Sequence, residues 1–452
     1  MMGHAIMRQN TFMRGGGAAF LFVLIFLWIL TFKRPSIPAV PGSWQPSSAQ
    51  LEVAQSPVVQ DGIKRASPPS NLGSYPKITL TEPADDNIRD IQNSTLGFQK
   101  IFILSMPNRS DKRDALTLSA YLTGLDVEFI DGVNGSLVSE KAYPQPWKQD
   151  EPAGTIGCWR GHMEIYQKMV REKISTAMIM EDDVDWDVMI KAQMTEFARG
   201  TRYLQKSVSP THSPYGDGWD ILSTGHCGIW NKVREDQDYW VSENDPTVVV
   251  PIQREWWRKP NLTPPALAGD RSRVVMSPYQ LSCLASYAVS LRGAARIIYD
   301  QAILPNAQGI DSGLGAICKR HEYGFNSCLA AYPMITGVHR PAGDMTRESD
   351  RKTLRTGRVR EKAQSDNLMF PVRMNLGSLL LGDTVVKAQW PDHAMVQELD
   401  TRTYELPRGR GVFVRGDEYI KDVPEEEQKV LTDTAQVEKK AVTETEEKKA
   451  EE

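Results

Sequence analysis

Four carboxylates within five residues follow the apolar run 178–180, namely Glu181, Asp182, Asp183 and Asp185. Side chains of an extended segment alternate between its two faces, so we expect Glu181, Asp183 and Asp185 to point one way and Asp182 the other. Three such carboxylates repel one another at neutral pH unless a cation such as Mg²⁺ or Mn²⁺ lies among them. The pattern favours a divalent-metal site, and the alternative is a solvated acidic turn after a strand.

The elements around the acidic run alternate between strand and helix patterns. Residues 100–104 and 127–130 have the composition of buried strands, and apolar residues at helical spacing lie between them. A second helical pattern follows residues 154–162 and precedes the acidic run. Strands that alternate with helices predict a parallel sheet. The acidic run then follows a strand, at the edge where open α/β sheets bind their ligands.

Six segments resemble, in order and spacing, parts of the glycosyltransferase family 25 domain, which includes bacterial lipooligosaccharide galactosyltransferases and collagen galactosyltransferases. They are IFILSMPNRSDKR, VEFIDGVNG, TIGCWRGHMEIYQ, AMIMEDDVDWD, GWDILSTG and CLASYAVSLRGAARII. The resemblance covers residues 98–345. It implies an α/β, GT-A-like nucleotide-sugar-binding fold with a mostly parallel central sheet. It also implies transfer of a sugar, expected to be galactose from UDP-galactose, to a glycan or glycoprotein acceptor with inversion at the anomeric carbon.

The resemblance implies a metal ion that bridges the two phosphates of the leaving nucleotide. Asp183 is then the expected first ligand and Asp185 the reserve, while Glu181 assists the metal or contacts the ribose. The third protein ligand of such sites is commonly a histidine or aspartate from late in the domain, and His339 occupies such a position. The alternative for His339 is an exposed loop imidazole.

The loop after the first predicted strand is expected to hold the nucleotide. It carries Asn108, Arg109 and Arg113, and guanidinium groups suit diphosphate oxygens. Arg113 could equally be a solvated helix residue. Asp182 completes the acidic part of the predicted nucleotide-binding set.

Two further residues match positions of the family. His162 matches the histidine of a G-C-x-x-S-H element, although Gly161 stands where serine is usual, which leaves helix packing open beside nucleotide or acceptor contact. Asp311 matches a late acidic position and is the candidate base that takes the proton from the acceptor hydroxyl. Its alternative is the N-cap of a short helix.

The N-terminal region has the composition of a membrane anchor. Residues 15–32 form an uncharged stretch of 18 residues, which spans about 27 Å as a helix. We expect a signal anchor, because no small-x-small cleavage site precedes the prolines that follow; a cleaved signal peptide is the alternative. The resemblance implies a single-pass type II protein of the Golgi or endoplasmic reticulum membrane, with a lumenal catalytic domain. The predicted segments are a cytosolic tail 1–14, the anchor 15–32, a flexible stem 33–97, the catalytic domain 98–345, a C-terminal extension 346–423 and a disordered acidic tail 424–452.

Composition narrows the possible partners. The formal charge is −4, and residues 425–452 alone hold ten acids and five lysines, a net charge of −5, so the remainder is near +1. The sequence lacks a basic stripe interleaved with aromatic residues, which is the pattern that indicates nucleic-acid binding. The five cysteines permit one or two disulfides with at least one free thiol. Two other functions stay open: a metal-dependent phosphoesterase, and a catalytically silent membrane scaffold of the same fold.

Overall fold

The computed structural model describes residues 82–83, 86–147, 150–208, 210–233, 235–254, 259–320, 327–350 and 357–419. All of them belong to one of the two compact units into which the chain divides, residues 66–452. The predicted cytosolic tail 1–14, anchor 15–32 and acidic tail 424–452 lie outside the described residues. Within the described ranges, no helix has both the length and the apolar composition needed to cross a membrane.

A nine-stranded sheet forms the centre of the described unit, in the order β18-β7-β8-β11-β5-β10-β3-β1-β2. Its strands are β1 (Lys100–Ser105), β2 (Glu128–Asp131), β3 (Thr176–Glu181), β5 (Ile221–Gly225), β7 (Gln237–Ser242), β8 (Arg273–Met276), β10 (Ser286–Ser290), β11 (Cys328–Tyr332) and β18 (Arg410–Val414).

Most strands of this sheet share one direction. The pairs β1·β2, β1·β3 and β5·β11 are parallel, whereas β10, β8 and β18 run antiparallel to their neighbours. Six of the nine strands therefore point the same way, which confirms the predicted mostly parallel α/β sheet in strand direction. The antiparallel insertions make it a mixed sheet, which is compatible with a GT-A-like fold.

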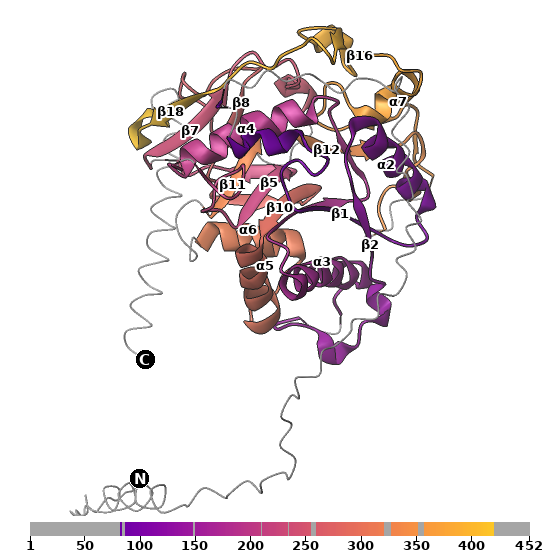
Figure 1. Cartoon of the computed structure of the whole chain (residues 1–452). Coiled ribbons are helices and arrows are strands. Elements are labelled where there is room, and N and C mark those ends of the chain that lie inside the picture. Colours follow the sequence, from indigo (N-terminus) through magenta and orange to yellow (C-terminus); the bar gives the residue numbers. More distant parts are fainter. Residues whose placement is uncertain are drawn as a thin grey trace, which may run out of the picture. The chain divides into compact units, whose positions relative to one another are not determined.

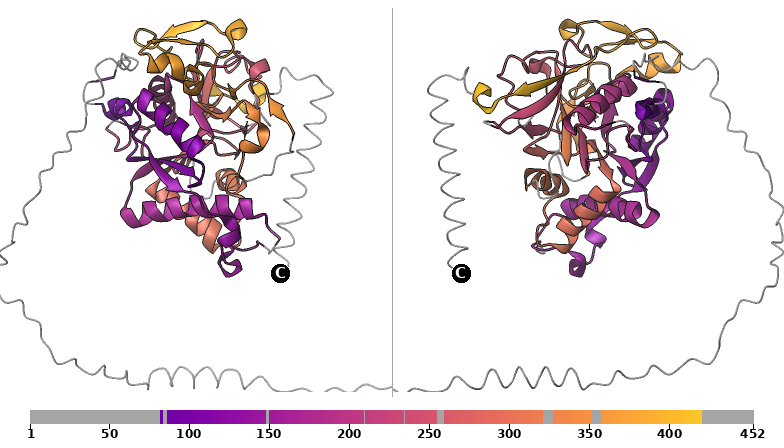
Figure 2. Two further views of the ribbon diagram at one scale, coloured as in Figure 1. Left: turned by 90° about the vertical axis from the view of Figure 1, so that its right-hand side faces the viewer. Right: turned by 60° about the vertical axis from the view of Figure 1, so that its left-hand side comes forward.

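Helices cover both faces of the sheet, as the alternation of its side chains requires. On one face, Ile101 and Met178 belong to the core that includes α2 (Ser110–Thr123) and α4 (Ile190–Leu204). On the other face, Phe102 and Ile179 belong to a second core that includes three further helices. These are α3 (Ala153–Glu172), α5 (Leu291–Ile298) and α6 (Ile310–Arg320). Figure 1 shows α3 and α5 together on one side of β1 and β10, with α4 on the other, and in both views of Figure 2 the violet α3 stays beside the salmon α5 and α6.

Small sheets surround the central one and shape its carboxyl edge. The most important here is the three-stranded sheet of β15 (Gln364–Ser365), β12 (Thr336–Arg340) and β4 (Val184–Trp186). Two-stranded pairs complete the set: β6 (Gly228–Trp230) with β9 (Gln280–Ser282), β13 (Gly343–Asp344) with β14 (Val359–Arg360), and β16 (Val385–Lys387) with β17 (Glu398–Asp400).

The folded unit extends beyond both predicted boundaries of the catalytic domain. Residues 87–92, assigned to the flexible stem, form a 3₁₀ helix whose Ile88 and Ile91 are buried in the main core. Residues beyond 345 are also part of the folded unit. The strand β18 pairs with β7 of the central sheet, and the helix α7 (Val372–Leu380) contributes Val372 to the main core. Apolar residues in both segments find partners in the central domain, which composition alone did not reveal.

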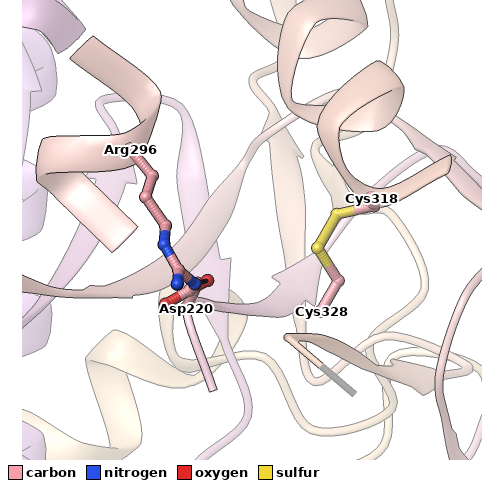
Figure 3. Close-up of a disulfide and its surroundings, with 4 residues drawn as sticks. All are labelled: Asp220, Arg296, Cys318 and Cys328. Carbon is pink, nitrogen blue, oxygen red and sulfur yellow. Dashed lines mark hydrogen bonds and ion pairs between the residues drawn. A yellow bond between two sulfur atoms is a disulfide. The ribbon is translucent and has the colours of Figure 1, made fainter. Parts of the chain in front are cut away.

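Two disulfides lie in the described unit and leave Cys158 as the cysteine outside them. Cys227 pairs with Cys283, and Cys318 at the end of α6 pairs with Cys328 at the start of β11 (Figure 3). The sequence permits this pattern but does not predict the pairing. Figure 3 also shows Arg296 of α5 reaching Asp220, a buried acid that pairs with it just before β5.

Candidate functional site

A cavity of about 980 Å³ opens at the carboxyl ends of β1 and β3. Its lining comes from the loop after β1, the loop after β2, the first turns of α3 and α6, and β12. The predicted site residues that line it are Asn108, Glu181, Asp182, Asp183 and Asp311. The position agrees with the general rule that open α/β sheets bind ligands outside the carboxyl ends of their strands.

The acidic run does not continue as one strand. β3 ends at Glu181, Asp182 and Asp183 form a turn, and β4 then pairs with β12 in a different sheet. The predicted alternation of faces is therefore wrong after Glu181, and Asp182 and Asp183 line the same cavity. Three successive carboxylates at the end of one strand result.

Asp185 lies outside the cavity lining, contrary to its predicted role as a reserve metal ligand. It is fully buried and accepts hydrogen bonds from the Ser365 hydroxyl at 2.6 Å and from the backbone of Trp186 at 2.8 Å. Burial raises the pKa of its carboxyl to about 6, against the opposing charge of Arg373. The contacts of Asp185 fasten β4 to its neighbours instead of facing a ligand.

Asp183 has the strongest ligand character of the three acids in the acidic turn, residues 181–183. Its Oδ1 is buried and has no hydrogen-bond partner in the described part of the chain. Burial raises the pKa of Asp183 to about 7, and the charge of Glu181 adds to this while Lys112 opposes it. An unpartnered buried carboxylate oxygen is costly, and a bound cation would remove that cost.

Lys112 is a site residue that the sequence analysis missed. It is buried on α2, donates to Asp182 Oδ1 at 2.5 Å and to Asp350 at 3.2 Å, and lines the cavity. Burial alone would lower the pKa of Lys112, but the charges of Asp182 and Asp183 outweigh it and raise that pKa. A signal was present, because Lys112 precedes the buried Leu116 by one helical turn.

The charge of the cavity lining is strongly unbalanced. Among the described residues it contains two cationic side chains, Lys112 and Arg340. Against them stand seven carboxylates, those of Glu181, Asp182, Asp183, Asp311, Glu348, Asp350 and Asp366. Asp350 and Glu348 also pair with Arg109 and Arg360 just outside the lining, which reduces the excess of five carboxylates to three. A nucleoside diphosphate is itself anionic, so these residues fit such a ligand only when a cation accompanies it.

His226 is a second unforeseen lining residue. It precedes the disulfide-bonded Cys227, and its Nε2 donates to the Ala331 carbonyl at 2.9 Å, which leaves the lone pair on Nδ1. Burial lowers the pKa of His226 to about 4, so the imidazole is neutral at physiological pH. A single histidine in a glycine-rich turn offers no distinctive pattern in the sequence.

The comparison with known proteins agrees with this geometry. Residues 98–207 match the family model described as glycosyltransferase family 25, LPS biosynthesis protein. Residues 98–207 are thus similar to a glycosyltransferase family 25 domain. The matched stretch runs from β1 to the end of α4 and contains the acidic turn, Lys112 and His162, whereas Asp311 and His339 lie beyond it.

Curated relatives match over a limited region. A "Glycosyltransferase 25 family member" from Aedes aegypti is 23% identical over 191 residues, 40% of this chain and 29% of that protein. "Procollagen galactosyltransferase 1-A" from Xenopus laevis is 21% identical over 197 residues, with 38% and 29% covered. "Probable inactive glycosyltransferase 25 family member 3" from Bos taurus is 22% identical over 144 residues, with 29% and 22% covered. The match thus spans less than a third of each relative.

The two arginines of the predicted nucleotide loop, Arg109 and Arg113, make contacts within the protein. Arg109 binds Asp111 at 2.9 Å and Asp350 at 2.5 Å. Arg113 donates to the Ser105 carbonyl at 2.7 Å and to Asp131 at 2.6 Å. Neither side chain lines the cavity, so the structure does not place these arginines where the predicted contacts with a diphosphate require them.

His339 approaches the acidic turn through its backbone. Its N–H donates to the Asp183 carbonyl at 2.7 Å, whereas its imidazole Nδ1 lies 3.0 Å from the Ser365 hydroxyl. Burial, with the charges of Arg373 and Arg340, lowers the pKa of His339 to about 3. The imidazole does not line the cavity, so the structure separates it from the predicted metal position.

Asp311 lies in the first turn of α6 and lines the cavity. It is the second residue of the helix, so the alternative N-cap role is not the one that it has. A carboxylate in the first turn is favoured by the positive end of the helix dipole. The position of Asp311 in the cavity lining is compatible with its predicted role as a base.

His162 is fully buried and does not line the cavity. Its helix lies directly against β1, where a Cβ at Gly161 would meet Leu104 at 3.1 Å. This close packing leaves little room for a side chain at Gly161. The loop after β2 also packs tightly, because a Cβ at Gly157 would lie 2.3 Å from the Val133 carbonyl oxygen.

Proposed function

We propose that this protein is a metal-dependent glycosyltransferase that uses a nucleoside-diphosphate sugar. The observation that carries the proposal is the cavity at the carboxyl ends of β1 and β3. Its lining contains seven carboxylates and two cationic side chains, and the buried Oδ1 of Asp183 has no hydrogen-bond partner among the described residues. The family 25 domain supports transfer of a sugar. The procollagen galactosyltransferases among the relatives favour UDP-galactose as donor and a glycan or glycoprotein as acceptor.

The cavity acids have distinct environments, and these define their proposed roles. Asp182 is neutralised by Lys112 and accepts from the Ser105 hydroxyl at 2.9 Å, so it positions Lys112 near the diphosphate. Asp183 is the proposed ligand for Mn²⁺ or Mg²⁺, because carboxylate oxygens are the ligands that these ions prefer. When bound there, the ion would stabilise the negative charge of the leaving nucleotide.

Two groups remain for the acceptor. Asp311 lines the cavity from α6, a different element from the acidic turn, and is the proposed base for the acceptor hydroxyl in an inverting transfer. The neutral imidazole of His226 presents a lone pair that can accept a hydrogen bond from a hydroxyl group. Asn108 of the loop after β1 can contribute polar contacts to the nucleotide.

The test is a donor assay on the purified full chain. UDP-galactose, UDP-glucose and GDP-mannose are incubated with and without Mn²⁺, and released nucleoside diphosphate is measured. We expect Mn²⁺-dependent release that is fastest with UDP-galactose. Absence of release with every donor would overturn the proposal and favour the silent scaffold, a role consistent with the relative described as a probable inactive family member.

We also propose a lumenal location with residues 15–32 as the membrane anchor. Two disulfides in the described unit support this, because disulfides persist in oxidising compartments such as the secretory pathway. Protease treatment of intact microsomes tests the location. Protection of the catalytic unit is expected, and its digestion in intact vesicles would contradict the proposal.

A further inference from the structure

Three potential metal-ligating side chains of different chemistry converge beside the acidic turn. The Cys158 sulfur, a ring nitrogen of His162 and a carboxylate oxygen of Glu181 all lie within 4.8 Å of one another. Cys158 and His162 lie four residues apart on one face of α3, and Glu181 is the last residue of β3. The convergence of a helix and a strand end therefore creates this Cys158–His162–Glu181 cluster.

The environment of His162 independently points to a ligand. The imidazole is fully buried, and its Nε2 has no hydrogen-bond partner within the described ranges. Glu181 Oε1 is 3.8 Å from this nitrogen, which is too far for a hydrogen bond. Buried polar atoms are normally satisfied, and a metal ion placed between these two atoms would satisfy both.

The other ring nitrogen is held as in histidines that bind metals. His162 Nδ1 lies 2.7 Å from the Tyr287 hydroxyl, whose oxygen is 2.5 Å from that of Tyr166. If Nδ1 donates to Tyr287, the lone pair is on Nε2 and points toward Glu181 and Cys158. Such an outer contact orients the ring of a ligating histidine and fixes its tautomer.

We propose that Cys158, His162 and Glu181 form a transition-metal site of the Zn²⁺ class, separate from the Mn²⁺ or Mg²⁺ position at Asp183. A thiolate and an imidazole favour Zn²⁺ or Co²⁺ over the hard ions that carboxylates alone select. Cys158 and Glu181 both line the cavity, so a fourth coordination position faces its interior. The site ties α3 to the end of β3 at the floor of the cavity.

The cysteine content makes the site accessible to spectroscopy. The other four cysteines of the chain are consumed by the two disulfides, so a thiolate–metal signal can arise only from Cys158. The full chain, kept in mild detergent and without reductant, is stripped with a chelator and titrated with Co²⁺. We expect a thiolate-to-cobalt absorption band that saturates at one equivalent and that Zn²⁺ abolishes by displacement.

Three variants make the assignment specific. Cys158→Ser should lose the band while its melting curve shows that the fold persists. Tyr287→Phe, which removes no ligand but does remove both the contact to His162 and the hydrogen bond to Tyr166, should weaken Co²⁺ binding by about 10- to 100-fold. Asp183→Asn should keep the band and lose Mn²⁺-dependent activity, so failure of this proposal is distinguishable from failure of the proposed function. Absence of the band in folded wild type, or its persistence in Cys158→Ser, would overturn the site.

Discussion

Replacing Asp183 by asparagine removes one anionic ligand from the acidic turn and preserves its shape. We expect Mn²⁺-dependent release of nucleoside diphosphate to fall by about 100-fold or more, on the order of 3 kcal/mol of transition-state stabilisation. The reason is that Asp183 Oδ1 is the buried carboxylate oxygen that lacks a partner in the described cavity. Metal affinity and turnover should fall together.

The same substitution should stabilise the metal-free protein. Burial raises the pKa of Asp183 from 3.8 to about 7. These about 3 units correspond to at most about 4 kcal/mol of penalty on the ionised form. Solvent in the cavity screens this charge, so we expect a gain of about 1 to 2 kcal/mol. A folded-state pKa above the unfolded value means that the penalty develops between about pH 4 and pH 7 and is complete above it.

The assay combines nucleotide release in Mn²⁺ with chemical unfolding in a chelator at about pH 8. Asp126→Asn is the matched control, because it removes the same charge. Asp126 is exposed and lies just before β2, at the amino ends of the strands and away from the cavity at their carboxyl ends. Wild-type turnover in Asp183→Asn would refute the metal-ligand role. A large loss of stability would show instead that the carboxylate holds the turn together.

Three further outcomes follow from particular contacts. Asp311→Asn should lower kcat by about 100- to 10,000-fold with little change in the KM for the donor. A rise in the donor KM as large as the fall in kcat would exclude the role of Asp311 as base. Gly157→Ala should destabilise the fold, because the added Cβ would lie 2.3 Å from a carbonyl oxygen. Gly377→Ala on α7 should instead stabilise the fold by about 0.5 to 1 kcal/mol, because nothing lies within 4 Å of its Cβ position. Equal melting temperatures for the two variants would contradict this packing. Burial raises the pKa of the Asp187 carboxyl from 3.8 to about 7. The free energy of unfolding of Asp187→Asn relative to wild type should therefore rise between about pH 4 and pH 7. A difference in unfolding free energy that does not change with pH would show that this carboxyl titrates normally.

Local patterns predicted the elements that build the site well. The strand at 100–104, a helix before the acidic run and a strand leading into that run all occur, although the helix already begins at Ala153 and the strand already ends at Glu181. Each rests on a periodicity of apolar residues, which depends on near neighbours in the chain. The cavity at the carboxyl ends of β1 and β3 follows from the same topology.

Errors arose where distant partners override local patterns. The strand alternation fails after Glu181 because β4 pairs with β12, about 150 residues later in the chain. Asp185 is buried by that pairing and by its hydrogen bond with Ser365, and the sequence of the acidic run predicts neither contact. The convergence of Cys158 with Glu181 likewise depends on how α3 packs on the sheet, which no spacing within either segment encodes.

Calorimetry of UDP binding to the full chain, with and without Mn²⁺, tests the central claim most directly. The cavity lining has seven carboxylates against two cations, so the anionic nucleotide should bind at least about tenfold more tightly in Mn²⁺ than in chelator. Asp183→Asn should lose this difference and Asp126→Asn should keep it. Equal UDP affinity with and without the metal in the wild-type protein would contradict a cation-dependent nucleotide site at the end of β3.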